Sequence, residues 1–430
     1  DNLVVVRRNK GEFKPPKIAK PKITPVAIDP SRKSAFATTV EAMNIRPLEP
    51  EWLVEGSHYT RHQLPSGEMI AVANRRNQLF AIEYVIETGM RRDKLLCFAL
   101  DLMEQSGTAE ISAQALQRQL YALGTTISAD CGLDWTRIQI SGIDRNMDAS
   151  VALLRAWLAG AALERATFDK LLANEMSRRK DAMDDPAAIS RALGQYAAFG
   201  ADSEYLLAAP SKLLAKADLD ALRGLLRDLP NHRHRVLYFG PRSAAAVGPA
   251  VVIGRNHRPA RAHPAPSYRQ LSASRIFFTH RDVAQSTLLL NAPQPPLAQD
   301  EVALSRVYSE FMGGGLGAVI GQEIREARGL AYRAFAAHRY GQRPSDPSVV
   351  FGVLGTQSDK TVEALGTMLD LLRDPPVQAE RLATAQQSIL VDYRSSRIDP
   401  RRIAEWVHNW DQRGLPGDPE DEQARWIEAT

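Results

Sequence analysis

The sequence predicts an α+β protein built from two tandem homologous units, each an antiparallel sheet with helices packed on one face. Two internal matches carry this prediction. RIQISGIDRNMDASVALLRAWL (137–158) can be laid over SVVFGVLGTQSDKTVEALGTMLDLL (348–372) at an offset of about 213, each with the pattern of a strand, a polar turn and an amphipathic helix. DDPAAISRALGQY (184–196) matches IDPRRIAEWVHNW (398–410) at an offset of 214. Both matches share one register, and the period of roughly 210 residues is too long for a solenoid.

Composition bounds the classes of function. The chain has 430 residues, 44% of them hydrophobic and 24% charged, with a formal net charge of +4. These values are ordinary for a globular protein of two or three domains. No apolar run approaches the ~18–20 residues of a membrane helix, so no membrane span is expected. The mild positive charge, without a basic face interleaved with aromatic residues, disfavours nucleic-acid binding. The compartment stays open; a bacterial periplasm and a cytoplasm are both compatible with the sequence.

Residues 1–55 are predicted to be an extended linker. The segment NKGEFKPPKIAKPKITP (9–25) is rich in Lys and Pro, and spaced prolines hold a chain extended. Such a segment can hardly belong to a packed core.

The first α+β unit is expected over residues 56–265. Strand patterns cover 67–75, 79–89, 125–132 and 136–143. Helical periodicity covers 93–105, 112–123, 146–161, 166–182 and 187–198. HRVLYFG (234–240) is predicted to be the closing strand of this sheet.

The second unit is expected over residues 266–430. Helices are predicted at 300–311 and 316–327, followed by a strand in LAYRAFAAH (330–338). The counterpart of the closing strand would begin near residue 448, beyond Thr430. The second unit is therefore expected to be truncated at its C-terminal end, and the two units should superpose at an offset near 213–214.

Cys97 and Cys131 do not form a metal-type Cys-x-x-Cys pair. Two small, buried apolar side chains are the favoured interpretation, although the pair would allow one disulfide. The paired histidines of HYTRH (58–62) and of HRH (232–234) lack a helix that would align their rings, which disfavours a metal site.

Two adjacent stretches, FMGGGLG (311–317) and EIREARGLAY (323–332), are the candidate site. A phosphate-binding loop would need Lys and Ser or Thr after the glycines, and neither is present. A tight turn between two helices is the simpler interpretation. Gly329 is predicted to end the second helix in a left-handed conformation. Arg325 would then lie in the last helical turn and Tyr332 near the start of a strand, so both side chains could face one space. Two ordinary surface residues are the alternative.

Three stretches together resemble the pitrilysin (insulinase-type) family of zinc metallopeptidases: LPSGEMIAVANR (64–75), GMRRDKLLCFALDLMEQSGT (89–108) and GGGLGAVIGQEIREARGLAY (313–332). The last is the most specific. The resemblance implies that two such units form one half of a clam-shell, and that two halves enclose a chamber around a peptide.

The chain departs from this family at the inverted zinc motif, His-x-x-Glu-His. The motif works because helical spacing places two imidazoles on one face beside the catalytic glutamate. The three corresponding positions are Phe98, Asp101 and Leu102, and Glu175 stands roughly where the family has its third ligand. This half is therefore expected to bind no metal and to have no cofactor of its own.

In the family, the half without zinc supplies an Arg and a Tyr that hydrogen-bond the scissile carbonyl and the substrate backbone. The resemblance assigns these roles to Arg325 and Tyr332, both expected to project into a shared concave surface free of local salt bridges. Gly313, Gly314 and Gly315 would let peptide backbone approach.

The implied partner is a zinc-binding half with His-x-x-Glu-His, fused upstream or a separate subunit, and this chain alone would be inactive. The alternative is a non-enzymatic scaffold or peptide-binding subunit of the same fold, like the respiratory-complex core proteins.

Overall fold

The computed structural model describes residues 34–44, 48–259, 267–269, 271–315 and 317–430. The chain divides into two compact units, Asp1–Leu48 and Glu49–Thr430. The described part of the first unit contains α1 (Ala35–Glu41), which Ser34 caps by accepting a hydrogen bond from the Ala37 N–H at 3.1 Å. A wholly extended linker over 1–55 is therefore wrong at this point, because the proline-free AFATTVE segment can form a capped turn of helix. The Lys/Pro-rich stretch 9–25 lies outside the described residues.

The larger unit contains a six-stranded sheet in the order β1-β2-β8-β3-β6-β5. Its strands are β1 (Thr60–Leu64), β2 (Gly67–Ala73), β3 (Leu79–Ile86), β5 (Thr126–Cys131), β6 (Thr136–Ile143) and β8 (His234–Gly240). All neighbours are antiparallel except β2 and β8, which pair in parallel. A small ladder joins β4 (Gly107–Thr108) to β7 (Ala161–Ala162). The predicted closing strand at 234–240 is confirmed, and it lies inside the sheet between β2 and β3.

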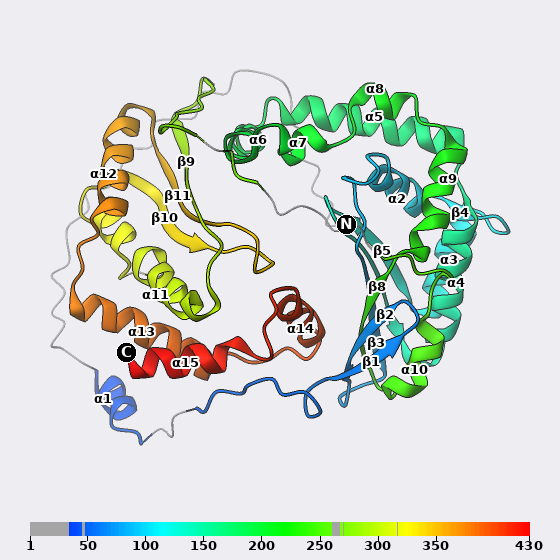
Figure 1. Cartoon of the computed structure of the whole chain (residues 1–430), viewed down its shortest axis with the longest axis horizontal. Helices are drawn as coiled ribbons and strands as arrows, with labels where there is room; N and C mark the ends of the chain where they lie inside the picture. The colour runs from blue at the N-terminus through cyan, green and yellow to red at the C-terminus, as the bar shows by residue number, and fades with distance from the viewer. Residues whose placement is uncertain (1–33, 45–47, 260–266, 270, 316) are drawn as a thin grey trace, which may run out of the picture. The chain divides into compact units, whose positions relative to one another are not determined.

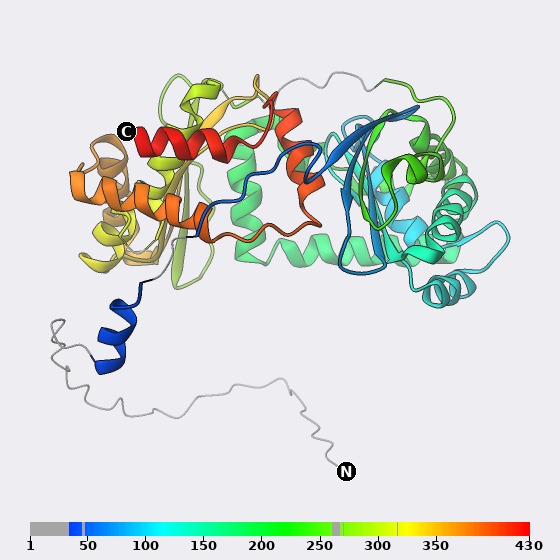
Figure 2. The ribbon, with the colours of Figure 1, turned by 90° about the horizontal axis from the view of Figure 1, so that it is seen from below.

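Helices cover one face of this sheet (Figures 1 and 2). They are α2 (Leu96–Glu104), α3 (Ala113–Leu123), α4 (Met147–Ala159), α5 (Arg165–Ala182), α9 (Leu219–Asp228) and α10 (Ala244–Val251). Their apolar residues join the inward side chains of the strands in one core, with Trp157 and Tyr84 among the largest buried side chains. Two short helices, α7 (Glu204–Leu207) and α8 (Ser211–Ala215), follow α6 (Pro186–Phe199).

A second sheet contains β9 (Gln285–Gln294), β10 (Ala331–Arg339) and β11 (Ser348–Gln357), in the antiparallel order β10-β11-β9. The helices that follow or flank it are α11 (Val302–Gly313), α12 (Thr361–Arg373), α13 (Ala379–Ser395), α14 (Ile403–Gln412) and α15 (Pro419–Ala429). α11 and α12 pack on this sheet through a core that includes Met312 and Met368. The prediction of an α+β fold with mainly antiparallel sheets is confirmed.

The order of elements repeats along the chain. The run β6–α4–α5–α6 is followed much later by β11–α12–α13–α14. α4 starts at Met147 and α12 at Thr361, while α5 starts at Arg165 and α13 at Ala379; each pair is 214 residues apart (361 − 147 and 379 − 165). The order β5-β6-β3 in the first sheet corresponds to β10-β11-β9 in the second. Superposition of the two predicted units stays a prediction.

The last helix of each run packs across the chain rather than on its own sheet. α14 covers the open face of the six-stranded sheet, where Ile403, Ala404 and Val407 join an apolar cluster with Ile70 and Leu237. α6 contacts β9 of the second sheet. The contact is close at Gly194, because a Cβ there would lie only 2.7 Å from Leu289 Cδ1. The expectation of helices on one face only is therefore incomplete, since each sheet also receives one helix from the other run.

Ion pairs fasten α14 to the sheet. Asp411 Oδ2 accepts a hydrogen bond from Arg61 Nη1, and Asp411 Oδ1 accepts one from Arg61 Nη2, both at 2.7 Å. Arg235 Nη1 also donates to Asp411 Oδ2 at 2.7 Å. One carboxylate thus holds two guanidinium groups from β1 and β8.

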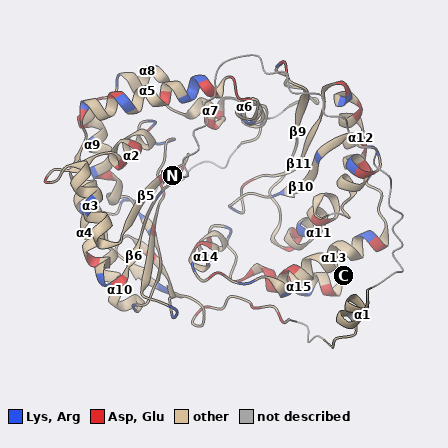
Figure 3. Cartoon of the chain, turned by 180° about the vertical axis from the view of Figure 1, so that it is seen from behind, with Lys and Arg blue, Asp and Glu red and all other residues tan. Residues whose placement is uncertain are grey.

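Figure 3 shows Lys and Arg together with Asp and Glu along α5, whereas α14 carries only acidic residues among its charged positions. Among the helices that the structure describes, none is long and apolar enough to cross a membrane.

Candidate functional site

Two irregularities of the backbone position Arg325 and Tyr332. Arg325 lies in a π-helical turn, Gly321–Glu326, in which the Ala327 N–H donates to the carbonyl of Gln322. The prediction of a regular α-helix over 316–327 is therefore wrong, because residues Gly321–Glu326 form a π-helix. Gly329 ends the turn with a φ of +57°, as predicted. π-helical turns are rare and are frequent at functional sites.

Tyr332 is the extra residue of a β-bulge. The register of β10 against β11 shifts between Ala331, which pairs with Thr356, and Arg333, which pairs with Gly355. A bulge leaves one residue outside the ladder and re-aims its side chain. Tyr332 is accordingly 90% exposed, and its hydroxyl has no hydrogen-bond partner within the described ranges. A large aromatic side chain held this far into solvent is free to contact a ligand.

The surroundings of the Arg325 side chain differ from those predicted. Its Nε donates to Glu326 Oε1 at 2.7 Å, so the predicted absence of a local salt bridge is wrong. The two side chains are adjacent in the turn and both are partly exposed, which favours such a contact. The terminal nitrogens Nη1 and Nη2 have no partner in the part of the chain that the structure describes. The forked end of the guanidinium therefore stays available.

The glycine stretch begins inside α11 rather than after it. A Cβ on Gly313 would collide with the carbonyl oxygen of Ala336 in β10, and one on Gly314 would collide with Glu310. Gly315 has a φ of +63°, which glycine adopts without steric cost. Close packing of α11 on β10 is thus sufficient reason for Gly313, and the space taken by Glu310 of the same helix for Gly314. Their predicted role in peptide approach stays a prediction.

The side chains at the two imidazole positions of the zinc motif lie in the core. Phe98 is 6% exposed and packs edge-on against Phe168 of α5, with ring centroids 5.6 Å apart. Leu102, four residues later on the same face of α2, is fully buried. Hydrocarbon therefore replaces both imidazole ligands, and the positions do not fit a zinc ion.

The two acidic positions do not replace the missing imidazole ligands. Partial burial removes water from the Asp101 carboxyl group, and the carboxylates of Glu104 and Glu175 lie nearby. Both effects disfavour its negative charge and raise the pKa of Asp101 to about 6. Partial burial alone would raise the pKa of Glu175, but hydrogen bonds from Arg178 and Arg179 outweigh it and lower that pKa. Glu175 thus already has two cationic partners, at 2.8 and 2.6 Å. Within the described ranges, no group of three or more His, Cys, Asp or Glu side chains could hold a metal.

Metal analysis provides a direct test of this site. We expect the purified chain to retain well under one zinc per molecule after dialysis, because neither Phe98 nor Leu102 can donate an electron pair to the ion. Inductively coupled plasma mass spectrometry of the dialysed protein measures this ratio. About one tightly held zinc per chain would contradict the degenerate-motif interpretation.

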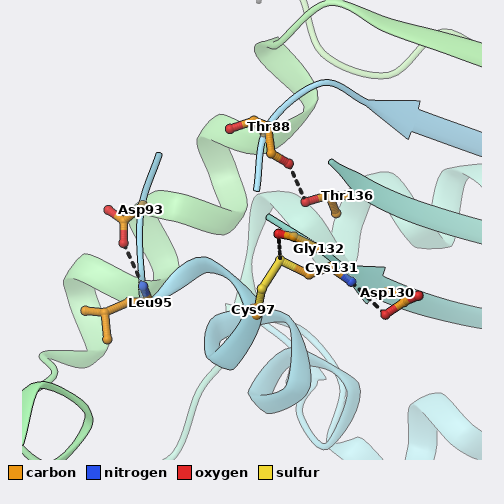
Figure 4. Close-up of a disulfide and its surroundings, with 8 residues drawn as sticks. All are labelled: Thr88, Asp93, Leu95, Cys97, Asp130, Cys131, Gly132 and Thr136. Atoms are coloured by element: carbon orange, nitrogen blue, oxygen red, sulfur yellow. Dashed lines mark hydrogen bonds between the residues drawn. A yellow bond between two sulfur atoms is a disulfide. The ribbon is translucent and has the colours of Figure 1, made fainter. Parts of the chain in front are cut away.

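A disulfide lies beside the degenerate motif. Cys97 of α2 is bonded to Cys131 of β5, with the two Cα atoms 5.3 Å apart (Figure 4). The favoured interpretation of two unbonded apolar side chains is therefore wrong. The sequence could not show this bond, because it depends on α2 lying along the edge strand β5. Glu104 of the same helix accepts a hydrogen bond from the Ala129 N–H of β5 at 2.6 Å.

Comparison with protein families identifies part of the chain. Residues 220–389, which include Arg325 and Tyr332, match the family model described as "Peptidase M16 inactive domain". This stretch of the chain is similar to a peptidase M16 inactive domain. The family-model match confirms the resemblance to the pitrilysin-type peptidases over these residues, and it is consistent with a half without the zinc site. The lack of fit for a metal at Phe98 and Leu102 agrees with that description. A search of curated proteins finds no match to the chain.

Several solved structures share the fold of this chain. A peptidase M16 inactive domain from Pseudomonas fluorescens has 16% identity and a TM-score of 0.68, with 87% of this chain and 92% of that chain covered. A protease from Helicobacter pylori has 15% identity and a TM-score of 0.61, with 89% and 97% covered. The periplasmic protease PqqL from Escherichia coli has 15% identity and a TM-score of 0.68; the alignment covers 95% of this chain and 46% of PqqL.

Proposed function

We propose that this chain is the non-zinc half of a pitrilysin-like metalloendopeptidase and lines part of its peptide-enclosing chamber. The observation that carries the proposal is the joint irregularity at Arg325 and Tyr332. A π-helical turn and a β-bulge present two polar side chains from the M16 inactive domain, one of them 90% exposed. Structure that departs from regular winding and pairing at two residues of one motif favours function over packing.

The PqqL comparison supports a second half. That protein is called a protease, and this chain covers 46% of it. The rest of such a protein has room for another half of similar size. For this chain we propose a partner with His-x-x-Glu-His, fused or separate, whose zinc and glutamate would supply the attacking water.

The residues of this chain would act on the other side of the scissile bond. The Tyr332 hydroxyl would donate a hydrogen bond to the carbonyl oxygen as negative charge develops on it. Arg325 Nη1 and Nη2 would donate to backbone carbonyls of the substrate, while Glu326 holds Nε and fixes the plane of the guanidinium. Donors placed before the reaction lower its barrier without reorganising at the moment of bond cleavage.

The scaffold or peptide-binding subunit is the second candidate. The Arg325–Glu326 ion pair favours it, since a guanidinium already paired at 2.7 Å has one donor fewer for a substrate. In that case the chamber would bind or enclose peptide without contributing to hydrolysis.

Reconstitution distinguishes the two functions. The chain is mixed in equimolar amount with the proposed His-x-x-Glu-His half, sought in the upstream or neighbouring coding sequence, and cleavage of a quenched fluorescent peptide is measured. We expect neither chain alone to cleave the peptide and the mixture to cleave it. The control is the same mixture in which the glutamate of the partner's motif is replaced by Gln. A zinc half that is equally active alone would leave the scaffold function in place.

A further inference from the structure

The face of the six-stranded sheet that receives α14 changes character across its width. On β2, β8 and β3 this face carries apolar side chains that pack under α14. On β5 and β6 the same face carries three cross-strand polar pairs: Thr126 with Ser141, Ser128 with Gln139, and Asp130 with Arg137. The apolar contacts of α14 thus end where the polar strands begin.

Two cavities occupy the space between α14 and these polar strands. One has a volume of about 320 Å³ and the other about 400 Å³. Both are lined by Ser128 and Gln139, so they adjoin and form one groove. The lining extends along β5 from Thr126 to Asp130, and four residue steps of a strand span about 13 Å. We call this space the α14 groove.

The α14 groove contains hydrogen-bonding side chains that the protein leaves unused. Six hydroxyl and carboxamide side chains in its lining make no hydrogen bond to any other described residue: Thr126, Ser128, Ser141, Gln342, Asn409 and Gln412. The charged lining is different. Arg137 Nη1 lies 3.3 Å from Glu83 Oε1 and 3.5 Å from Glu405 Oε1, so these three charges are paired. Asp130 and Arg401 also line the groove, make no ion pair with another described residue, and carry opposite charges. The available groups are therefore mainly neutral.

We propose that the α14 groove binds an extended, uncharged polar peptide segment of about four or five residues. Each peptide unit carries one N–H donor and one C=O acceptor. A carboxamide or hydroxyl side chain can accept a hydrogen bond from the donor and donate one to the acceptor. The length of the groove along β5 matches an extended chain of this size. The inference rests on the proposed peptide-binding function and names a second contact for the substrate, away from Arg325 and Tyr332.

A saccharide is the less suitable occupant. Sugars commonly need an open aromatic face as well as polar groups. Trp135, the aromatic ring beside the carboxamides of the larger cavity, already has the Arg137 guanidinium over its ring, 5.2 Å from the centroid. That contact occupies a face on which a sugar ring would stack.

The test uses the full chain and a fluorescein-labelled, amidated Ser-Asn-Thr-Asn-Ser pentapeptide. Fluorescence anisotropy gives the Kd for wild type and for two variants of Ser128, one of the two residues that line both cavities. Ser128→Val removes the hydroxyl and Ser128→Thr keeps it, while both side chains suit a strand. We expect Ser128→Val to weaken binding about 3–10-fold, the effect of one net hydrogen bond, and Ser128→Thr to stay within about 2-fold. Asn409→Ala on α14 should weaken binding similarly.

A benzophenone version of the same peptide locates the binding site. We expect photo-crosslinks on β5, β6 or α14 by peptide mass mapping. Equal Kd values for wild type, Ser128→Val and Asn409→Ala would overturn the groove, as would displacement of the probe by maltopentaose but not by unlabelled peptide. Loss of binding in Tyr332→Phe alone would also overturn it. Cleavage by the reconstituted pair can still depend on Tyr332 in each of these cases, so the groove can fail while the proposed function stands.

Discussion

Replacing Tyr332 with Phe is expected to lower the turnover of the reconstituted peptidase by about 10²–10³-fold, the usual cost of one lost donor to a developing oxyanion. The hydroxyl of Tyr332 has no partner among the described residues and the ring is 90% exposed, so its removal should not change folding. The measurement compares kcat for a quenched peptide between wild type and variant, each saturated with the zinc half.

Matched controls separate chemistry from a general surface effect. Tyr121 on α3 is 88% exposed, so Tyr121→Phe makes the same change at a similar tyrosine and should leave kcat unchanged. Arg325→Lys keeps the charge but loses the planar fork, and it should also impair turnover. Its control is Arg394→Lys, because the Arg394 side chain is 39% exposed and pairs with Glu428 much as Arg325, at 37%, pairs with Glu326. Unchanged kcat in both site variants would reduce Arg325 and Tyr332 to surface residues.

Loss of the Cys97–Cys131 disulfide is expected to lower the free energy of unfolding by about 3–4 kcal/mol. The bond joins residues 34 positions apart, and the chain-entropy relation gives this magnitude for a loop of such length. Guanidinium unfolding followed by circular dichroism would compare wild type with the Cys97→Ala/Cys131→Ala double variant.

Reductant provides the control for this prediction. It should shift the unfolding midpoint of wild type toward that of the double variant, and it should not shift the double variant itself. Alkylation under denaturing, non-reducing conditions gives an independent result. Modification of both cysteines there would show that the bond is absent and would contradict the prediction.

Local patterns were enough to predict most of the elements. Strand alternation at 136–143 and helical periodicity at 146–161 correspond to β6 and α4 because each segment makes contacts set by its own period. The motif EIREARGLAY likewise led to Arg325, Tyr332 and the left-handed Gly329. These features depend on residues that are close in sequence.

The remaining features depend on contacts between distant segments. The bulge at Tyr332 arises from the register of β10 against β11, and the pairing of Cys97 with Cys131 arises from α2 lying along β5. The position of α14 on the first sheet depends on contacts such as that of Asp411 with Arg61, 350 residues apart. No local pattern specifies such partners, so the α14 groove could not have been foreseen.

The crossed placement of α6 and α14 affects how the protein unfolds. Without α14, the sheet would expose Ile70, Val72 and Leu237 to water, and Arg61 and Arg235 would lose their common carboxylate. Without α6, Leu289 of β9 would lose its packing contact with the helix at Gly194. Unfolding of the segment that contains either sheet would therefore also remove the helix that packs on the other sheet. The two sheets should behave as one cooperative folding unit, so the boundary between the two predicted units is not expected to be a boundary of stability.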